Sequence, residues 1–178
     1  SIDLFDLKGV GKSPSRLDIS RIFSINETYI KTIEKKELFN YLKLYVNKYK
    51  NKLDDSKELI IFNSLDFLKN KAKTLEDIWN NAQYIITNKI QIGHEDKKLI
   101  DENSKKIIKD FIIEFEKLSK PSKENLEPII KALISNHKTN FKGVGQPLRI
   151  KLVGSRFGPG IYDIILSLKK DEVIRRLK

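Results

Sequence analysis

Two residue types, cysteine and methionine, are missing from this chain of 178 residues. Without cysteine the chain can form neither a disulfide framework nor a thiolate metal site, which agrees with a cytoplasmic protein. Because methionine is missing even at position 1, we expect the sequence to be an excised or processed piece of a longer protein. The length suffices for one ordinary domain or two small ones.

Long apolar runs are also missing. No apolar run approaches the roughly 20 residues that a bilayer-spanning helix requires. The opening stretch SIDLFDLKGV lacks the basic start and the apolar block of a signal peptide. Since 33% of the residues are charged, we expect a soluble globular protein without a membrane partner.

Charge of one sign is in excess, with a formal net charge of +11 at pH 7. Clustered lysine and arginine residues bind polyanions by releasing counterions from phosphates. The chain is also crowded with lysine, asparagine and isoleucine together, a bias that AT-rich coding produces without selection for binding. The charge alone therefore leaves nucleic-acid binding and a compositional bias equally open.

Apolar residues recur at three- and four-residue spacing along most of the chain, and no alternating segments of strand type stand in a regular array. We therefore predict an all-α fold. One helix is expected over residues 35–53, a second after a cap at 54–56, a third from Thr74, and two more with apolar stripes over 107–118 and 125–136. The expected core residues of the first three are Leu38, Leu42, Tyr45, Val46 and Tyr49; Leu59, Ile60, Phe62, Leu65 and Leu68; and Leu75, Ile78, Trp79, Ala82 and Ile85.

No catalytic constellation and no metal site is found in the sequence. The stretch GVGKSPS, residues 9–15, resembles the end of a phosphate loop, but Asp6 stands where that motif needs its first glycine. The only histidines, His94 and His137, lack nearby ligand pairs, so we expect ordinary surface roles for both. Trp79 and Tyr84 fit a helix core better than a base-stacking role.

Three stretches carry a resemblance to a known family. They are FDLKGVGKSPSRLDISRIFSINETYI (5–30), KTLEDIWNNAQYII (73–86) and GQPLRIKLVGSRFGPGIYDIILSLKKDEVIRRL (145–177). Together they resemble the carboxy-terminal part of bacterial glutamyl-tRNA synthetase. The last stretch is the most specific, with its GQPLR and GPGIYDI motifs. It departs from the family where residues 169–172, KKDE, replace a turn that contains glycine.

The resemblance implies an all-helical anticodon-binding region in which two helical subdomains form a cage around the anticodon loop. We expect a remnant of the stem-contact region over residues 1–36, a first subdomain over 37–88 and a second over 89–178. The catalytic domain is absent from the sequence given, so the chain is expected to bind tRNA as a monomer, without a cofactor of its own. The parent enzyme would use ATP and magnesium to ligate glutamate to glutamate tRNA.

The resemblance also implies which residues meet the anticodon. The glutamine and arginine of the family's QPLR motif face the anticodon, which carries over to Gln146 and Arg149. The proline and the apolar residue of the GPG(I/L) turn line the pocket for its first base, which carries over to Pro159 and Ile161. Amide and guanidinium groups suit this role because they can meet the exposed edges of unpaired bases.

The remaining features of the turn leave alternatives open. Arg156 has no firm family counterpart, and we expect it to contact a phosphate. Gly158 and Gly160 let a backbone approach a base closely, and the helix start beside them can meet a phosphate. The alternative for Gly154, Gly158 and Gly160 is simple helix punctuation.

Two lysines stand where the family has arginines. Lys71 matches an arginine that is associated with the third anticodon letter, and Lys131 matches one in a long helix. A lysine separates C from G less sharply than a fixed guanidinium fork does, so the parent enzyme could also accept glutamine tRNA. The alternative is neutral drift from arginine to lysine. For the whole chain, the alternatives to a synthetase are a free-standing basic helical nucleic-acid-binding domain and a scaffold for protein partners.

Overall fold

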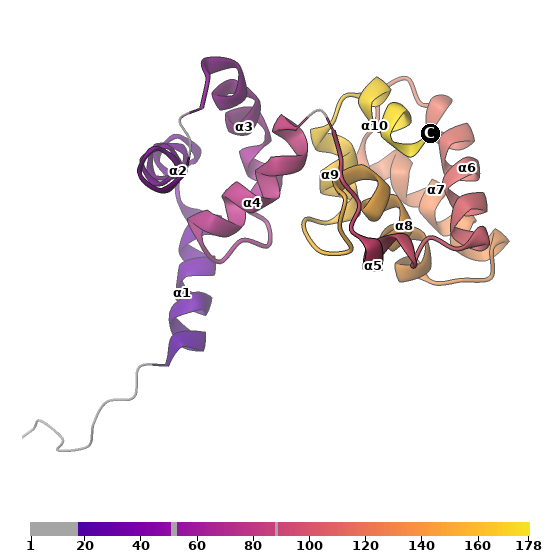
Figure 1. Cartoon of the computed structure of the whole chain (residues 1–178), viewed down its shortest axis with the longest axis horizontal. Coiled ribbons are helices and arrows are strands. Elements are labelled where there is room, and N and C mark those ends of the chain that lie inside the picture. The colour runs from indigo at the N-terminus through magenta and orange to yellow at the C-terminus, as the bar shows by residue number, and fades with distance from the viewer. Residues whose placement is uncertain (1–17, 51–52, 88) are drawn as a thin grey trace, which may run out of the picture.

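The structure, a computed structural model, describes residues 18–50, 53–87 and 89–178. The phosphate-loop candidate at 9–15 and the first half of the expected stem-contact remnant lie outside these ranges. The described residues form helices and no strand, so the all-α prediction is confirmed. Figure 1 shows the helices in two groups, α1–α4 and α5–α10.

The first group comprises α1 (Ile19–Thr32), α2 (Lys35–Tyr49), α3 (Asp55–Leu68) and α4 (Leu75–Ile86). The starts of α3 and α4 match the predicted caps. Asp54 accepts a hydrogen bond of 2.9 Å from the Lys57 backbone N–H, and Thr74 forms a capping box with Asp77. These side chains satisfy N–H groups that have no partner within the helix.

The predicted core residues of this group need a correction. Leu59 and Ile60 are exposed, and Ile61 is fully buried in their place. Residues 59–62 are all apolar, so spacing alone leaves the rotation of α3 ambiguous, and packing against α2, α4 and α9 selects the face that carries Ile61 and Leu65. Tyr49 is also exposed, and α2 ends there rather than at residue 53.

The second group comprises α5 (His94–Lys97), α6 (Glu102–Glu116), α7 (Lys123–Asn136), α8 (Phe141–Val153), α9 (Ile161–Ser167) and α10 (Lys170–Leu177). Its core contains the stacked rings of Phe111 and Phe115, whose centroids are 5.3 Å apart. Ser122 forms a capping box with Asn125 at the start of α7, as predicted. The structure thus confirms the predicted helices on either side of the 119–122 loop.

Polar contacts join the two groups. The Tyr84 hydroxyl on α4 lies 2.7 Å from the Ser167 hydroxyl on α9, and burial raises the pKa of Tyr84 to about 12. The buried Arg176 donates hydrogen bonds to the carbonyls of Thr87 and Leu152, at 3.3 and 2.8 Å, and pairs with Glu172 at 2.5 Å. Tyr84 is buried and Trp79 packs against the core, as predicted. This joint, Arg176 with its partners, holds α4 and α8–α10 in one arrangement.

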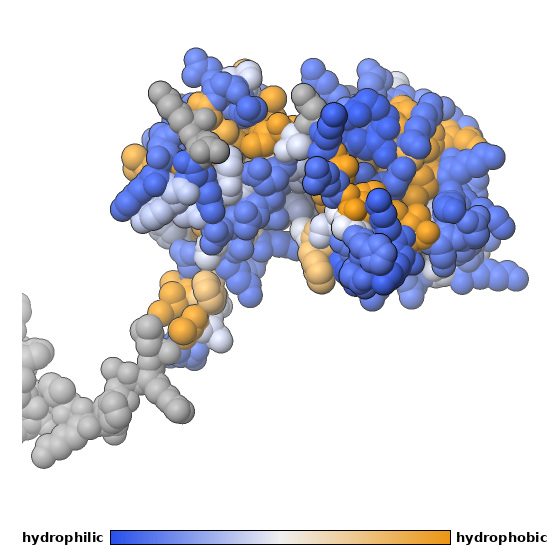
Figure 2. All heavy atoms as spheres, in the orientation of Figure 1, coloured by the Kyte–Doolittle hydropathy of each residue, from blue (hydrophilic) through white to orange (hydrophobic). Residues whose placement is uncertain are grey.

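One apolar surface is left uncovered. In Figure 1 α1 extends away from the other helices, and Figure 2 shows orange side chains along it. Ile19, Ile22, Phe23 and Tyr29 are all exposed on this helix, between 41 and 59%. Within the ranges 18–50, 53–87 and 89–178, no helix has the length and apolar character needed to cross a membrane.

Candidate nucleic-acid interface

The sequence-predicted motif forms α8 and the loop of residues 154–160 that follows it. Asn140 begins α8 by accepting a hydrogen bond of 2.9 Å from the Gly143 N–H. Gly154 ends it in the left-handed region with a φ of 85°. A Cβ atom at Gly154 would collide with the backbone oxygen of Gln91. Gly154 therefore terminates α8, which is the alternative that the sequence had left open for this glycine.

A pocket of about 360 Å³ opens between α8 and this loop. It brings together three of the predicted site residues, Gln146, Arg149 and Arg156. We call it the α8 pocket, and its lining residues are Phe141, Lys142, Gly145, Gln146, Arg149, Arg156 and Phe157. The lining combines cations, an amide and two aromatic rings, and it contains no acidic residue.

Arg149 is turned toward the loop that borders the pocket. Its Nε donates a hydrogen bond of 3.1 Å to the Pro159 carbonyl, and its Nη1 donates one of 3.2 Å to the Arg156 carbonyl. Burial lowers the pKa of its guanidinium from the ordinary value, although an arginine stays charged in proteins. Nη2 donates to no acceptor among the described residues. The side chain therefore fixes the loop with two donors and retains others for a ligand.

Arg156 has a partner too. Its Nε lies 2.5 Å from the Asp96 carboxylate on α5, and the two side chains are 33 and 15% exposed. Its guanidinium carbon is 5.7 Å from the centroid of the Phe157 ring. The arginine thus ties the loop to α5 and supports the ring beside it, and a phosphate would have to share it with Asp96.

Pro159 and Ile161 lie below the surface of the loop. Ile161 is only 1% exposed and belongs to the core cluster, and Pro159 is buried. Gly158 has a φ of 129° with open space around its Cα, so glycine is needed there for the backbone conformation and the loop is accessible. At Gly160 a Cβ would lie 3.0 Å from the Asp163 carboxylate, which occupies the start of α9. That carboxylate competes with any phosphate at the helix start.

The groups left available in the α8 pocket include some that the sequence did not indicate. The Gln146 amide makes no hydrogen bond with the described part of the chain. Phe157 is 75% exposed at the loop and Phe141 is 48% exposed at the start of α8. An aromatic residue between an arginine and a glycine, in a loop rather than on a helical stripe, is the signal that would have indicated Phe157.

The two predicted lysines lie elsewhere. Lys71 is exposed in the α3–α4 loop, and Lys131 is exposed on α7. The α3–α4 loop is fixed by backbone groups, since the N–H groups of Lys73 and Thr74 both donate to the Asp77 carboxylate, at 2.9 and 3.0 Å. Neither lysine lines the α8 pocket.

The family profile described as "Anticodon binding domain" matches residues 19–178. The chain belongs to the anticodon-binding domain family. This match includes α1, which the sequence assigned to a stem-contact remnant ending at residue 36.

Glutamate–tRNA ligases are among the relatives of this anticodon-binding domain. It is 57% identical over 177 residues to the glutamate–tRNA ligase of Pelagibacter ubique, with 99% of this chain and 38% of that protein covered. It is 31% identical over 180 residues to glutamate–tRNA ligase 1 of Cereibacter sphaeroides, again with 38% of that protein covered. The resemblance stated from the sequence is thus confirmed, and the chain spans about two fifths of the length of these relatives.

Solved structures show the same fold. A glutamate tRNA ligase from Elizabethkingia meningosepticum, in complex with its amino acid, aligns with a TM-score of 0.69 at 21% identity. The alignment covers 97% of this chain and 34% of that one.

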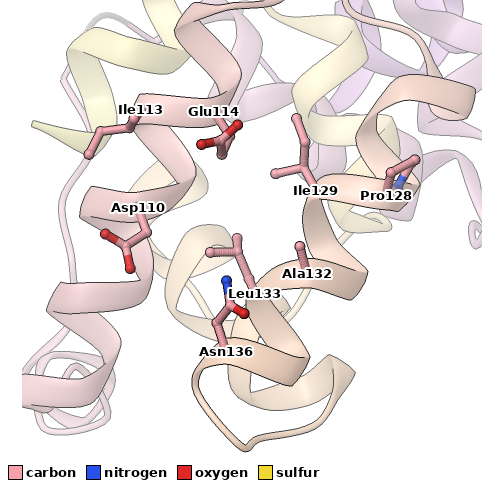
Figure 3. Close-up of a pocket in the computed structure, with 8 residues that line it drawn as sticks. All are labelled: Asp110, Ile113, Glu114, Pro128, Ile129, Ala132, Leu133 and Asn136. Carbon is pink, nitrogen blue, oxygen red and sulfur yellow. The ribbon is translucent and has the colours of Figure 1, made fainter.

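A second pocket of the anticodon-binding domain differs sharply from the α8 pocket. It holds about 420 Å³ between α6 and α7 and is drawn in Figure 3. Its charged lining residues are Asp110 and Glu114, so it repels phosphate. At its edge Asp110 lies 2.8 Å from His137, which is 11% exposed and joins α6 to α7 rather than lying freely on the surface. Across the described ranges, no cluster of three metal-ligating side chains occurs.

Proposed function

We propose that this chain binds the anticodon loop of glutamate tRNA as part of a glutamate–tRNA ligase. The observation that carries the proposal is the α8 pocket, where the unpartnered amide of Gln146 lies beside exposed rings and cations. The amide presents both a donor and acceptors, which suits the edge of an unpaired base. The family match and the similarity to glutamate–tRNA ligases support the same conclusion.

Each group of the α8 pocket has a distinct role in this proposal. Gln146 reads a base edge, and Phe157 provides a face on which a base stacks. Arg149 positions the loop and directs its remaining donors at the same base. Lys142 and Arg156 attract the phosphates that flank it. Pro159 and Ile161 act from below, by supporting the shape of the loop.

Lys71 and Lys131 extend this interface beyond the pocket. We assign Lys71 to the third anticodon letter, as the family resemblance implies, and Lys131 to the anticodon arm. In Figure 1 the α3–α4 loop and the α8–α9 loop lie on the same lower side of the two helical groups. An anticodon loop held there would meet Lys71 from one group and Gln146 from the other. Because a lysine at position 71 separates C from G only weakly, glutamine tRNA is then a second substrate of the parent enzyme.

The parent protein is proposed to activate glutamate with ATP and magnesium and to transfer it to the tRNA, in the cytoplasm and as a monomer. Those steps require a catalytic domain outside this sequence, and the exposed apolar stripe on α1 gives such a domain a surface to pack against. Within this chain we retain the division into a stem-contact remnant at 1–36 and subdomains at 37–88 and 89–178.

The test is a binding titration with glutamate tRNA and with the same tRNA carrying an unrelated anticodon. We expect the substituted tRNA to bind at least about tenfold more weakly at a fixed salt concentration. Both affinities should fall steeply as salt rises, because phosphate contacts release counterions. Equal affinity for both tRNAs would leave only a general basic nucleic-acid-binding domain. An affinity that does not respond to salt would favour a scaffold for protein partners.

A further inference from the structure

A third concave surface lies on the opposite flank of α6 from the acidic pocket of Figure 3. It holds about 710 Å³ and is bordered by α6, α10, the end of α8 and the segment around α5. We call it the lysine groove, and its lining residues are Ile92, Lys97, Ile100, Lys105, Ile108, Lys109, Ile112, Lys151, Leu177 and Lys178. It shares no lining residue with the α8 pocket.

The composition of the lysine groove is unusual even in a basic chain. Half of its ten lining residues are lysine, the other half are isoleucine or leucine, and none is acidic. Figure 2 shows the resulting pattern, an orange surface between α6, α10 and the segment before α5, surrounded by blue. The groove therefore combines an apolar floor with a positive rim.

The positive rim is only partly neutralised by the protein itself. Lys105 pairs with Glu102 at 2.5 Å, and Lys178 pairs with Glu116 at 3.2 Å. Lys97, Lys109 and Lys151 form no ion pair within the described portion of the chain. Three unpaired ammonium groups around one apolar floor favour a ligand that supplies several negative charges and apolar side chains together.

We propose that the lysine groove binds an acidic amphipathic helix of a partner protein. The apolar side chains of such a helix would enter the isoleucine floor at three- and four-residue spacing, and its carboxylates would pair with the lysines. RNA is a poorer match, because the groove offers neither an aromatic ring for stacking nor a guanidinium fork for a base edge, whereas the α8 pocket offers both. The isoleucine floor also offers neither a charge nor a hydrogen-bond donor to a phosphate backbone.

The probe is a synthetic helical peptide in which leucines form one stripe and the other positions are mainly glutamate. A peptide of the same composition with the leucines scrambled controls for charge alone. We expect the amphipathic peptide to bind at least about tenfold more tightly than the scrambled one, since only it presents an apolar face. Its binding should persist when the α8 pocket is filled with glutamate tRNA.

Two matched double variants locate the binding. Lys109→Glu with Lys151→Glu reverses two unpaired charges in the groove and should weaken peptide binding at least about tenfold. Lys36→Glu with Lys106→Glu makes the same charge change at exposed lysines outside it, and Lys106 lies on α6 itself. This control should change peptide binding less than about twofold. Thermal unfolding of both variants confirms that each is folded.

Several results would overturn the proposal. Equal binding of the amphipathic and the scrambled peptides would reduce the groove to a nonspecific basic surface. A loss of tRNA affinity in the groove variant alone would make this face a tRNA contact. Concentration-dependent self-association that only the groove variant abolishes would make a second copy of the chain the occupant. An anticodon-independent tRNA interaction would defeat the proposed function and leave this inference standing.

Discussion

The α8–α9 loop and the α3–α4 loop are both proposed to meet the anticodon, but they are built differently. Arg149, on α8, holds the carbonyls of residues 156 and 159 in the α8–α9 loop, and Arg156 ties this loop to Asp96. In the α3–α4 loop backbone groups bond to Asp77, and Lys71 extends from the surface. The first loop uses its cations to set its shape, while the second presents a cation directly.

An arginine in a binding motif can therefore act by shaping the binding loop and not by contacting the ligand. At the α8 pocket the groups that face a ligand freely are the Gln146 amide, on α8, and the Phe157 ring, in the loop that follows. The guanidinium groups mainly support them. Specificity should therefore depend on the shape of this loop, whereas in the α3–α4 loop it should depend on one flexible side chain.

The largest expected effect comes from breaking the joint that holds both regions together. Arg176→Leu removes hydrogen bonds to the carbonyls of Thr87 and Leu152 and leaves Glu172 without this partner. We expect the free energy of unfolding to fall by about 2–3 kcal/mol, because the two carbonyls lose the buried donor that satisfies them. Urea unfolding measures it, and the exposed Lys178→Ala is the control, with a change below about 0.5 kcal/mol.

The same joint predicts a pH dependence. Hydrogen bonds from Arg175 and Arg176 lower the pKa of Glu172 to about 2, from an ordinary 4.5. A carboxyl whose folded-state pKa is lowered contributes stability that is fully present above its unfolded pKa and is lost as the pH falls toward the folded value. The stability of the wild type should therefore fall between about pH 4.5 and 2, and Glu172→Gln should flatten this part of the curve. Identical acid curves would contradict the assignment.

The next largest effect concerns the arginine that shapes the α8–α9 loop. Arg149→Ala should weaken binding of glutamate tRNA by about 1–3 kcal/mol, because the loop loses two hydrogen bonds to its carbonyls. Arg149→Lys should recover little of this, since an ammonium group does not reproduce the planar fork. The loss should depend on the anticodon. If tRNAs with unrelated anticodons lose the same affinity, base recognition at this loop is excluded.

The smallest effect should come from the α3–α4 loop. Lys71→Arg should sharpen the preference for glutamate tRNA over glutamine tRNA by less than about 1–2 kcal/mol, because a fixed fork separates C from G better than an ammonium group does. Binding of glutamate tRNA itself should barely change. Affinities for both tRNAs at one salt concentration measure this difference. A wild-type chain that already rejects glutamine tRNA strongly would make Lys71 a product of drift.

The sequence predicted the helical class, the caps at Asp54, Thr74 and Ser122, and the stretch in which Gln146, Arg149 and Arg156 meet. It did not predict which way the arginines turn. The acceptors of Arg149 are carbonyls of a loop whose path depends on left-handed backbone at Gly154 and Gly158, and the partner of Arg156 is Asp96, which lies 60 residues away in the sequence. The burial of Ile61, where the sequence predicted burial of Leu59 and Ile60, has a similar cause. Four consecutive apolar residues fit more than one buried face, and only packing against α2, α4 and α9 decides between them.

A double-mutant cycle tests whether the α8 pocket itself receives an anticodon base. One change is Phe157→Ala, which removes a ring that is 75% exposed and carries little of the core. The other is an anticodon substitution in glutamate tRNA. We predict a coupling free energy of at least about 1 kcal/mol between the two changes, because the ring and the base interact only when both are present. Strictly additive losses would show that Phe157 and the anticodon do not meet, and would contradict binding of an anticodon base in the α8 pocket.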